Sequence, residues 1–295
     1  MRNQQGSSAI ILVVCFSVMA MFLVIGADVG VITYEKAKLS NALDASALAG
    51  AQSLPGKPDE SRILVSDYLS ANGLDPDKSS VTITEDNHSL KVDGYKDLKT
   101  FFGPLIGRDT VTITESVTVI VGPINEVRSG IRPLVIEQRA LEYGDLVDLK
   151  LNAKTNYKGN FGAVSLGGTG ASNYEQNLLY GFKGTIKIGD IIYTEAGNKV
   201  SVINPLRNHL STDFHTFENY KRESERLWVI PVVDELQVEG KSPVTVVGFA
   251  EFFIEDIGIQ SGQTSLKGRF IKYTGSGTVN ELAPDYGLYG IKIKH

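Results

Sequence analysis

Three side chains of metal-binding type, His209, Asp213 and His215, lie close together in the second half of the chain. Imidazole nitrogens and carboxylate oxygens are common zinc ligands. A zinc hydrolase normally places two histidines four residues apart with a glutamate as general base, and that arrangement is absent here. We interpret the three residues as polar surface residues beside a predicted helix, and we expect no metal site.

Two acidic pairs, Asp234–Glu235 and Glu255–Asp256, each follow a predicted strand. If the two strands form a hairpin, these carboxylates could bind Ca²⁺, which takes several oxygen ligands. The alternative is that they are charged strand ends in water, and we favour this interpretation.

Two glycine-rich segments resemble parts of active sites. Gly167-Gly168-Thr169-Gly170 is similar to a phosphate loop, but no Lys-Ser/Thr follows it and no helix signal starts after it. Gly275-Ser276-Gly277 is the nearest match to a nucleophile elbow and indicates a hairpin turn. We therefore expect no catalytic residues and no cofactor, and hence a protein that is not an enzyme.

Composition narrows the function classes further. The 295 residues are 42% hydrophobic and carry 29 Lys+Arg against 34 Asp+Glu, a net charge of -5. This composition is typical of a folded protein, and the acidic balance argues against nucleic-acid binding. The single cysteine, Cys15, excludes an internal disulfide and the cysteine-rich metal sites.

The first structural element that the sequence predicts is an uncharged, apolar stretch near the N-terminus. Residues 9–27 are almost entirely apolar. As a helix they would extend about 28 Å, close to the bilayer core of about 30 Å. Arg2 on the short side predicts that residues 1–8 stay in the cytoplasm and that the bulk of the chain is extracytoplasmic.

Three other interpretations of this stretch are weaker. A cleaved signal peptide has a shorter apolar region and a small-residue cleavage site, whereas Gly26-Ala27-Asp28 is a poor site. A lipoprotein modified at Cys15 would need a small residue where Val14 stands. A buried core helix would need cover on all faces of residues 10–25. We favour a single-pass transmembrane anchor.

The anchor is predicted to continue as a helical stem. Residues 31–54 contain no proline and are rich in alanine and leucine, the best helix formers. Pro55-Gly56 then ends the helix. The sequence thus predicts one helix of about 46 residues, 8–53, roughly 70 Å long.

A pattern of small and polar residues runs through this helix. Residues 6–54 resemble the N-terminal module of TadG-like Flp (Tad) pilus-assembly proteins. The matching positions are Gly6, Asp28, Gly30, Asn41, Asp44, Ala45, Ala47, Leu48, Ala49, Gly50 and Ala51. The resemblance implies a membrane-anchored, non-enzymatic component of a Tad-type pilus system, whose partners are the lipid bilayer and pilins or pilus-assembly membrane proteins.

The chain departs from relatives in two respects. Pilin-type processing requires a glutamate five residues after the cleaved glycine, but Ile11 is at this distance from Gly6. We therefore expect no cleavage by prepilin peptidase. The Asp-x-Ser-x-Ser metal site of relatives with a von Willebrand-type domain is also missing.

Small residues allow a second helix to approach closely. We therefore predict a contact face for a pilin-like partner on the helix, with Asp28 at the outer edge of the span, where its carboxylate can reach water or the partner. The residues of this face are Asp28, Asn41, Asp44, Ala45, Leu48 and Ala49. The alternative is that the alanine-rich helix packs on the body of its own protein, and the sequence leaves both open.

The body of the chain is predicted to be α+β. A helix at 59–72 and strands at 80–85, 90–94 and 110–121 complete a pilin-like α+β module over 28–122, with a short helix or turn at 99–107 between the last two strands. Gly122-Pro123 provides the boundary.

The second half, 127–295, is predicted to be mostly β and sandwich-like, because short strands alternate with glycine turns. It also resembles the family's longer forms at 159–162, 226–233 and 247–250. Strands are predicted at 145–151, 184–188, 190–194, 226–233, 245–254, 268–273 and 288–294, with one helix in 206–221. The aromatic residues of two predicted strands could form a binding surface, but we favour a place in the core for Trp228, Phe249, Phe252 and Phe253.

Together these observations predict a membrane-anchored component of Tad/Flp pilus assembly. The alternative is a membrane-tethered surface-binding, adhesin-like module that uses the glycine-rich β half.

Overall fold

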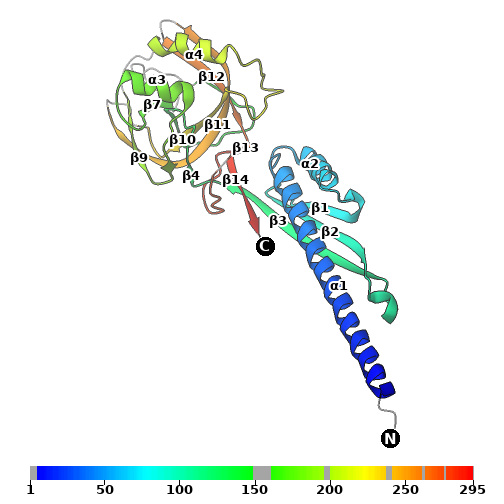
Figure 1. The fold of residues 1–295 in the computed structure, drawn as a ribbon. Helices are drawn as coiled ribbons and strands as arrows, with labels where there is room; N and C mark the ends of the chain where they lie inside the picture. The colour runs from blue at the N-terminus through cyan, green and yellow to red at the C-terminus, as the bar shows by residue number, and fades with distance from the viewer. Residues whose placement is uncertain are drawn as a thin grey trace. The chain divides into compact units, whose positions relative to one another are not determined.

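The computed structural model describes residues 5–148, 161–195, 200–236, 241–260, 263–275 and 277–294. The chain folds into two units (Figure 1). Unit 1 comprises the N-terminal helix up to Ala51, Lys57–Val119 and the C-terminal residues from Ile293. Unit 2 comprises Gln52–Gly56 and Ile120–Lys292.

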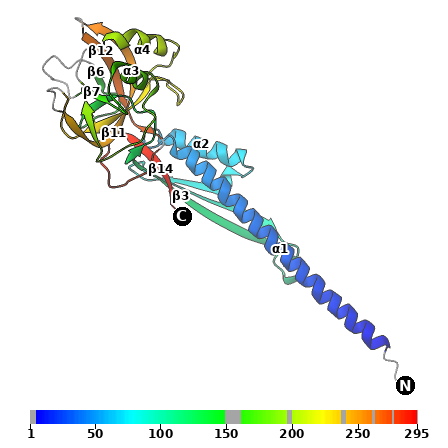
Figure 2. The same cartoon turned by 60° about the vertical axis from the view of Figure 1, so that its left-hand side comes forward.

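A single long helix, α1 (Gln5–Ala51), begins unit 1 and is drawn in blue in Figures 1 and 2. Its 47 residues confirm the predicted uninterrupted helix. Apolar side chains in its first half are exposed, with Phe22 at 70% and Leu23 at 69%. The part of α1 from Ala9 onward is long and apolar enough to cross a membrane.

The rest of unit 1 is a helix and a small sheet. Helix α2 (Pro58–Ala71) starts with proline. Proline suits the first turn, because N–H groups there have no acceptor within the helix and the lack of one costs no hydrogen bond. The strands that follow are β1 (Ser79–Ile83), β2 (Ser89–Lys99) and β3 (Thr110–Pro123), in the sheet order β1-β2-β3. Short 3₁₀ turns, η1 (Pro76–Lys78) and η2 (Gly103–Ile106), precede β1 and β3.

The predicted helix and strands of unit 1 are confirmed to within two residues at each end, except at the end of β2. Strand β3 continues through Gly122-Pro123, where a break was predicted. Strand β2 extends to Lys99, five residues beyond the predicted end at Gly94. Leu90, Val92 and Leu98 are buried along it, so alternation continues past Gly94, and glycine there did not end the strand. Gly94 allows close packing instead, because an added Cβ would lie 2.9 Å from Leu43.

Unit 2 is built on a seven-stranded sheet in the order β10-β5-β7-β9-β11-β12-β6, in which β10 also pairs with β11. This additional pairing closes the sheet on itself. Strand β11 makes closure possible because its 18 residues pair with β9 at one end and with β10 and β12 further along. The bounds are β5 (Leu134–Glu137), β6 (Leu146–Asp148), β7 (Phe161–Ser165), β9 (Ile191–Thr194), β10 (Leu227–Val233), β11 (Pro243–Gln260) and β12 (Gln263–Ile271).

Two hydrophobic clusters form the core of unit 2. Along β10, Trp228, Ile230 and Val232 belong to one cluster and Val233 to the other. Helices α3 (Ala171–Tyr180) and α4 (Ile203–Leu210) contribute Leu178 and Leu206, among other residues, to the cluster that contains Trp228. The remaining short elements are β4 (Glu126–Val127), β8 (Ile186–Lys187), β13 (Tyr273–Thr274), β14 (Leu288–Lys294) and the 3₁₀ turn η3 (Val200–Val202).

The α+β class with a mostly β second half is confirmed. Trp228, Phe249, Phe252 and Phe253 are at most 3% exposed, which confirms the predicted aromatic core. The closed sheet differs from the predicted sandwich of two stacked sheets, because the long strand β11 pairs with β9, β10 and β12 and so connects both sides. Register shifts at Val232/Val233 and at Ile254/Asp256 add the local twist that such bending needs.

Two helix predictions in unit 2 need correction. Helix α3 does start directly after Gly170, where no helix was expected. Its stability comes from tertiary contacts, because Tyr174 and Leu178 are buried and Asn177 donates to Leu166 O. The helix sought in 206–221 is α4 and ends at Leu210. Residues 149–151 of the predicted strand and Gly159-Asn160 lie outside the described residues.

Candidate partner-contact face on helix α1

One side of the outer half of α1 is buried within unit 1. Leu39 and Leu43 lie against Gly94 of β2, and Gly50 lies against Val65 of α2. The spacing of four and seven residues puts these positions on one helical face. The signature residues Ala47, Ala49, Gly50 and Ala51 are buried as well. The small residues of the signature therefore serve close packing inside unit 1.

Four of the six predicted contact residues remain accessible. Asn41 is exposed, and Asp44, Ala45 and Leu48 are half-buried. Their spacing of three, four and seven residues makes them a single stripe, which we call the open stripe. It offers an amide, a carboxylate, a methyl group and an isobutyl group, which suit close helix packing with one polar anchor.

The other two predicted contact residues are buried. Asp28 is 8% exposed and Ala49 is 5% exposed. The Asp28 carboxylate accepts hydrogen bonds from the backbone N–H groups of Phe101 and Phe102, both at 2.7 Å. Asp28 therefore holds the turn between β2 and β3 against α1 rather than facing water. No local sequence signal shows this, because the donors lie 73 and 74 residues away.

Two ion pairs join α1 to the sheet. Glu35 accepts from Lys96 Nζ at 2.6 Å, and Lys36 Nζ lies 3.1 Å from Glu115. The hydrogen bond from Lys96 holds the pKa of Glu35 below its usual range. Both pairs leave the open stripe untouched.

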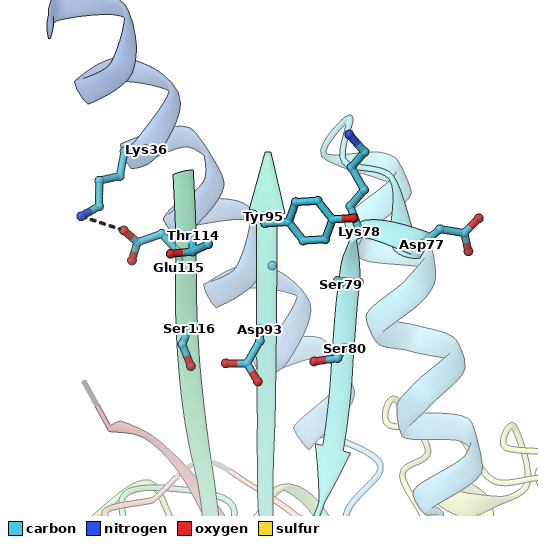
Figure 3. Close-up of a pocket in the computed structure, with 11 residues that line it drawn as sticks. Lys36, Asp77, Lys78, Ser79, Ser80, Asp93, Tyr95, Thr114, Glu115 and Ser116 are labelled. Carbon is cyan, nitrogen blue, oxygen red and sulfur yellow. Dashed lines mark ion pairs between the residues drawn. The ribbon is translucent and has the colours of Figure 1, made fainter. Parts of the chain in front are cut away.

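A hollow of about 720 Å³ lies over the sheet face of β1, β2 and β3 that carries Asp93 and Tyr95 (Figure 3). Its lining is polar and includes Ser80, Ser116 and the Lys36–Glu115 pair. It brings hydroxyl groups and charges together without a nucleophile–base pair. From the sequence alone, these residues are indistinguishable from the solvent-facing positions of strands with alternating polar and apolar residues.

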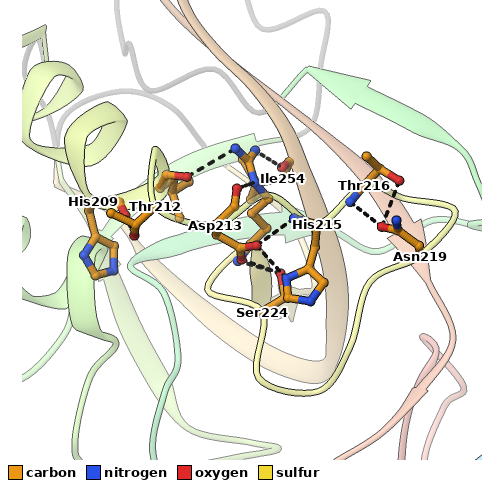
Figure 4. Close-up of polar contacts among 10 residues, drawn as sticks. His209, Thr212, Asp213, His215, Thr216, Asn219, Ser224 and Ile254 are labelled. Carbon is orange, nitrogen blue, oxygen red and sulfur yellow. Dashed lines mark hydrogen bonds and ion pairs between the residues drawn. The ribbon is translucent and has the colours of Figure 1, made fainter.

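The strongest polar constellation of unit 2 surrounds Asp213 (Figure 4). Ser224 Oγ donates to Asp213 Oδ2 at 2.6 Å, and His215 Nδ1 lies 2.6 Å from Asp213 Oδ1. The serine and the histidine both bind the aspartate, so the histidine is not placed as the general base on the serine hydroxyl that a serine nucleophile uses. Burial opposes ionisation, but the hydrogen bonds from Ser224 and His215 outweigh it and lower the pKa of Asp213 to about 2.

The three ligand-type residues His209, Asp213 and His215 do not converge on one point but contact different partners. His209 Nε2 lies 3.5 Å from Glu225 Oε2 and its ring contacts Tyr180, whereas His215 pairs with Asp213. Within the described ranges, no group of three or more His, Cys, Asp and Glu side chains could hold a metal ion.

The remaining sequence candidates are also structural. Asp234 accepts from the backbone N–H groups of Glu235 and Thr245, and Glu255 pairs with Arg269 at 2.5 Å. The loop Gly167–Gly170 is held by Asn173, which donates to Gly168 O. Ser276, in the middle of the Gly-Ser-Gly segment, lies outside the described residues.

Sequence reasoning missed one buried acid, Glu251 on β11. It is 3% exposed, and its Oε2 has no hydrogen-bond partner among the residues that the structure describes. Burial raises the pKa of Glu251 to about 8, against the opposing charge of Arg222. Its neighbours Ala250, Phe252 and Phe253 are fully apolar, so the pattern predicted only a core strand.

Comparison with known families matches the N-terminal segment. Residues 6–53 match the Tad family model, which describes TadE/G-like Flp pilus-assembly proteins. No curated protein and no solved structure gives a significant match. The family match confirms the resemblance and supports involvement in pilus assembly, a structural rather than an enzymatic activity.

Proposed function

We propose that this chain is a single-pass component of Tad/Flp pilus assembly whose two units lie outside the cytoplasmic membrane. The observation that carries the proposal is the combination of features in α1. One uninterrupted helix holds the apolar span and the pilus-assembly signature, and a stripe beyond the span stays open. Such a helix anchors the protein and presents a helical face at a constant distance from the bilayer.

The open stripe is the proposed site for a pilin-like partner helix. Close approach is favoured by Ala45, and Leu48 supplies apolar area next to the carboxylate of Asp44. Asp28 and Ala49 support the stripe from inside unit 1 rather than touching the partner.

The test is pilus assembly in cells that express the double variant Asp44→Lys, Leu48→Arg from the native locus. We expect loss of surface pili, because two cations replace an anion and an apolar side chain on the contact face. The matched control is Asp59→Lys with Ile63→Arg on α2, which changes an exposed aspartate and an exposed aliphatic residue at the same spacing. Normal piliation in the α1 variant, or equal loss in the control, would contradict the proposed face.

Topology is tested separately by adding protease to spheroplasts. The proposal expects digestion of both units and survival of a short membrane-bound N-terminal fragment that contains the span. A fully protected body would place the units in the cytoplasm, and a body released without protease would mean that α1 is cleaved.

A second candidate function is a tethered surface-binding module, favoured by exposed aromatic side chains on unit 2. Phe214 is 88% exposed beside a hollow of about 370 Å³ that also contains His215 and Asn219. Binding of cells that display wild type or Phe214→Ser to host or bacterial surfaces tests this function. Equal binding by the two would remove the observation that supports it.

A further inference from the structure

The turn between β2 and β3 has an apolar sequence and presents an exposed phenylalanine, Phe101. Residues 101–107 have the sequence Phe-Phe-Gly-Pro-Leu-Ile-Gly, without a single polar side chain. Phe101 is 70% exposed, and Pro104 is exposed as well. The accessible cations Lys99 and Arg108 flank the segment, followed by Asp109. We call residues 101–107 the hairpin tip.

Strand β2 runs antiparallel to α1, which fixes the level of the hairpin tip on the helix. Contacts descend in step along both elements. They are Leu90 with Gly50, Gly94 with Leu43, Lys96 with Glu35, and Phe101 with Asp28. From Gly50 to Asp28 the helix covers about 33 Å at 1.5 Å per residue. From Leu90 to Phe101 the strand covers about 37 Å at 3.4 Å per residue, so the two distances agree.

Asp28 is the first charged residue after the span, directly beyond Ala27. The hydrogen bonds from Phe101 and Phe102 therefore hold the hairpin tip at the height where the apolar span ends. They also satisfy two backbone N–H groups, which are costly to leave unpaired near hydrocarbon. The same hydrogen bonds satisfy the Asp28 carboxylate. Neither the carboxylate nor the two N–H groups would therefore be left unpaired close to lipid.

We propose that the hairpin tip is a second membrane-contact site, which enters the outer headgroup region of the bilayer that α1 spans. This inference rests on the proposed membrane anchor. An exposed phenylalanine is favoured at the boundary between headgroups and acyl chains, because its apolar ring exchanges water for lipid there. Lys99 and Arg108 lie where they can reach lipid phosphates, with a net charge of one positive over residues 99–109.

A second contact has a mechanical consequence. A single helix alone leaves unit 1 free to tilt and rotate about the span. A hairpin tip in the same leaflet adds a second point of attachment. Two attachment points restrict the rotation of unit 1 about the axis of α1. The open stripe would then be presented to its partner in one orientation.

Tryptophan quenching by brominated lipids tests this proposal in the full chain. The native Trp228 is fully buried in unit 2 and provides a constant background. Three conservative aromatic replacements report three heights, Phe22→Trp in the span, Phe101→Trp at the hairpin tip and Tyr95→Trp on the same strand, about 20 Å further from the tip. The protein is reconstituted into vesicles of zwitterionic and anionic lipids brominated close to the headgroups.

We expect Phe101→Trp to be quenched to an extent comparable with Phe22→Trp, and Tyr95→Trp to match the wild type. Quenching of Phe22→Trp without quenching of Phe101→Trp would overturn the hairpin-tip contact and leave the anchor intact. Absence of quenching at Phe22→Trp would overturn the anchor and, with it, this inference. Quenching at Tyr95→Trp as well would mean that unit 1 lies flat on the lipid, which contradicts a contact confined to the tip.

Discussion

Asp28 in unit 1 and Asp213 in unit 2 are both shielded carboxylates that accept several hydrogen bonds, but their donors lie at very different distances along the chain. Asp28 binds N–H groups more than 70 residues away. Asp213 binds groups of His215, Ser224 and Arg226, all within 13 residues. The cluster around Asp213 has the residue types of a catalytic site, but it stabilises a loop. The contact of Asp28 has no signal in the local sequence, but it joins two elements of unit 1.

The difference follows from what each carboxylate must stabilise. The loop around Asp213 has little regular structure, so its backbone and side chains need a local acceptor. The turn after β2 has its own 3₁₀ hydrogen bonds, and Asp28 instead joins two preformed elements. Removing Asp28 should therefore release a contact between elements, and removing Asp213 should loosen one loop.

The largest effect is expected for Asp28→Ala. Hydrogen bonds to a charged acceptor contribute about 1.5–3 kcal/mol each, so losing two should cost about 3–6 kcal/mol of local stability. Amide exchange at Phe101 and Phe102 should accelerate by roughly 100- to 20,000-fold, since about 1.4 kcal/mol corresponds to a factor of ten. Hydrogen–deuterium exchange of the full chain in nanodiscs measures this change.

The matched control for Asp28→Ala is Asp44→Ala, another aspartate on α1, which should leave both amides unchanged. Slow exchange at Phe101 and Phe102 in the Asp28 variant would mean that packing rather than the carboxylate holds the hairpin tip.

A smaller, pH-dependent effect is expected at Asp213. Its folded-state pKa of about 2 lies below the unfolded value of about 3.9. The carboxylate therefore contributes about 2 kcal/mol above pH 4, and this contribution is lost as pH falls from about 4 to about 2. Denaturant unfolding followed by the buried Trp228 should show Asp213→Asn less stable than wild type at pH 7.

The stability gap between wild type and Asp213→Asn should close in acid. A stability gap that does not depend on pH would mean that the packing of the Asp213 side chain, not its charge, stabilises the loop. Ser224→Ala is the control, because it removes only one of the hydrogen-bond donors to Asp213.

The smallest effect is expected for Glu35→Gln. The pair with Lys96 is short but partly exposed, and such pairs contribute about 0.2–1 kcal/mol. The lowered pKa of Glu35 means that this contribution is present at neutral pH and disappears as Glu35 is protonated in acid. Amide exchange along β2 should change by less than a factor of about five in 0.1 M salt. A change as large as that of Asp28→Ala would make the ion pair, not Asp28, the main link between β2 and α1.

Several features were predictable because local chemistry determines them. The apolar run and the alanine-rich stem predict α1, and Pro55-Gly56 predicts its end. Alternating β-branched residues predict β3, and the aromatic positions of β10 and β11 predict a core hairpin. In contrast, α3 was missed because its few apolar residues become helical only when Tyr174 and Leu178 are buried against the sheet.

The contact face illustrates the same limit. The sequence predicted six residues of one signature, but periodicity alone does not say which face of an amphipathic helix its own sheet covers. Packing against Gly94 of β2 and Val65 of α2 buries one side and leaves Asn41, Asp44, Ala45 and Leu48 accessible.

By itself, the sequence determined the long apolar N-terminal helix, its family resemblance and the β-rich character of the second half, because hydrophobic periodicity and turn residues act through interactions between near neighbours in the chain. Only the tertiary structure decided that Asp28 holds the hairpin tip where the apolar stretch of α1 ends, and that β11 closes the sheet of unit 2. Those features depend on pairing between residues far apart in the chain, where burial and hydrogen-bond satisfaction select one partner among many.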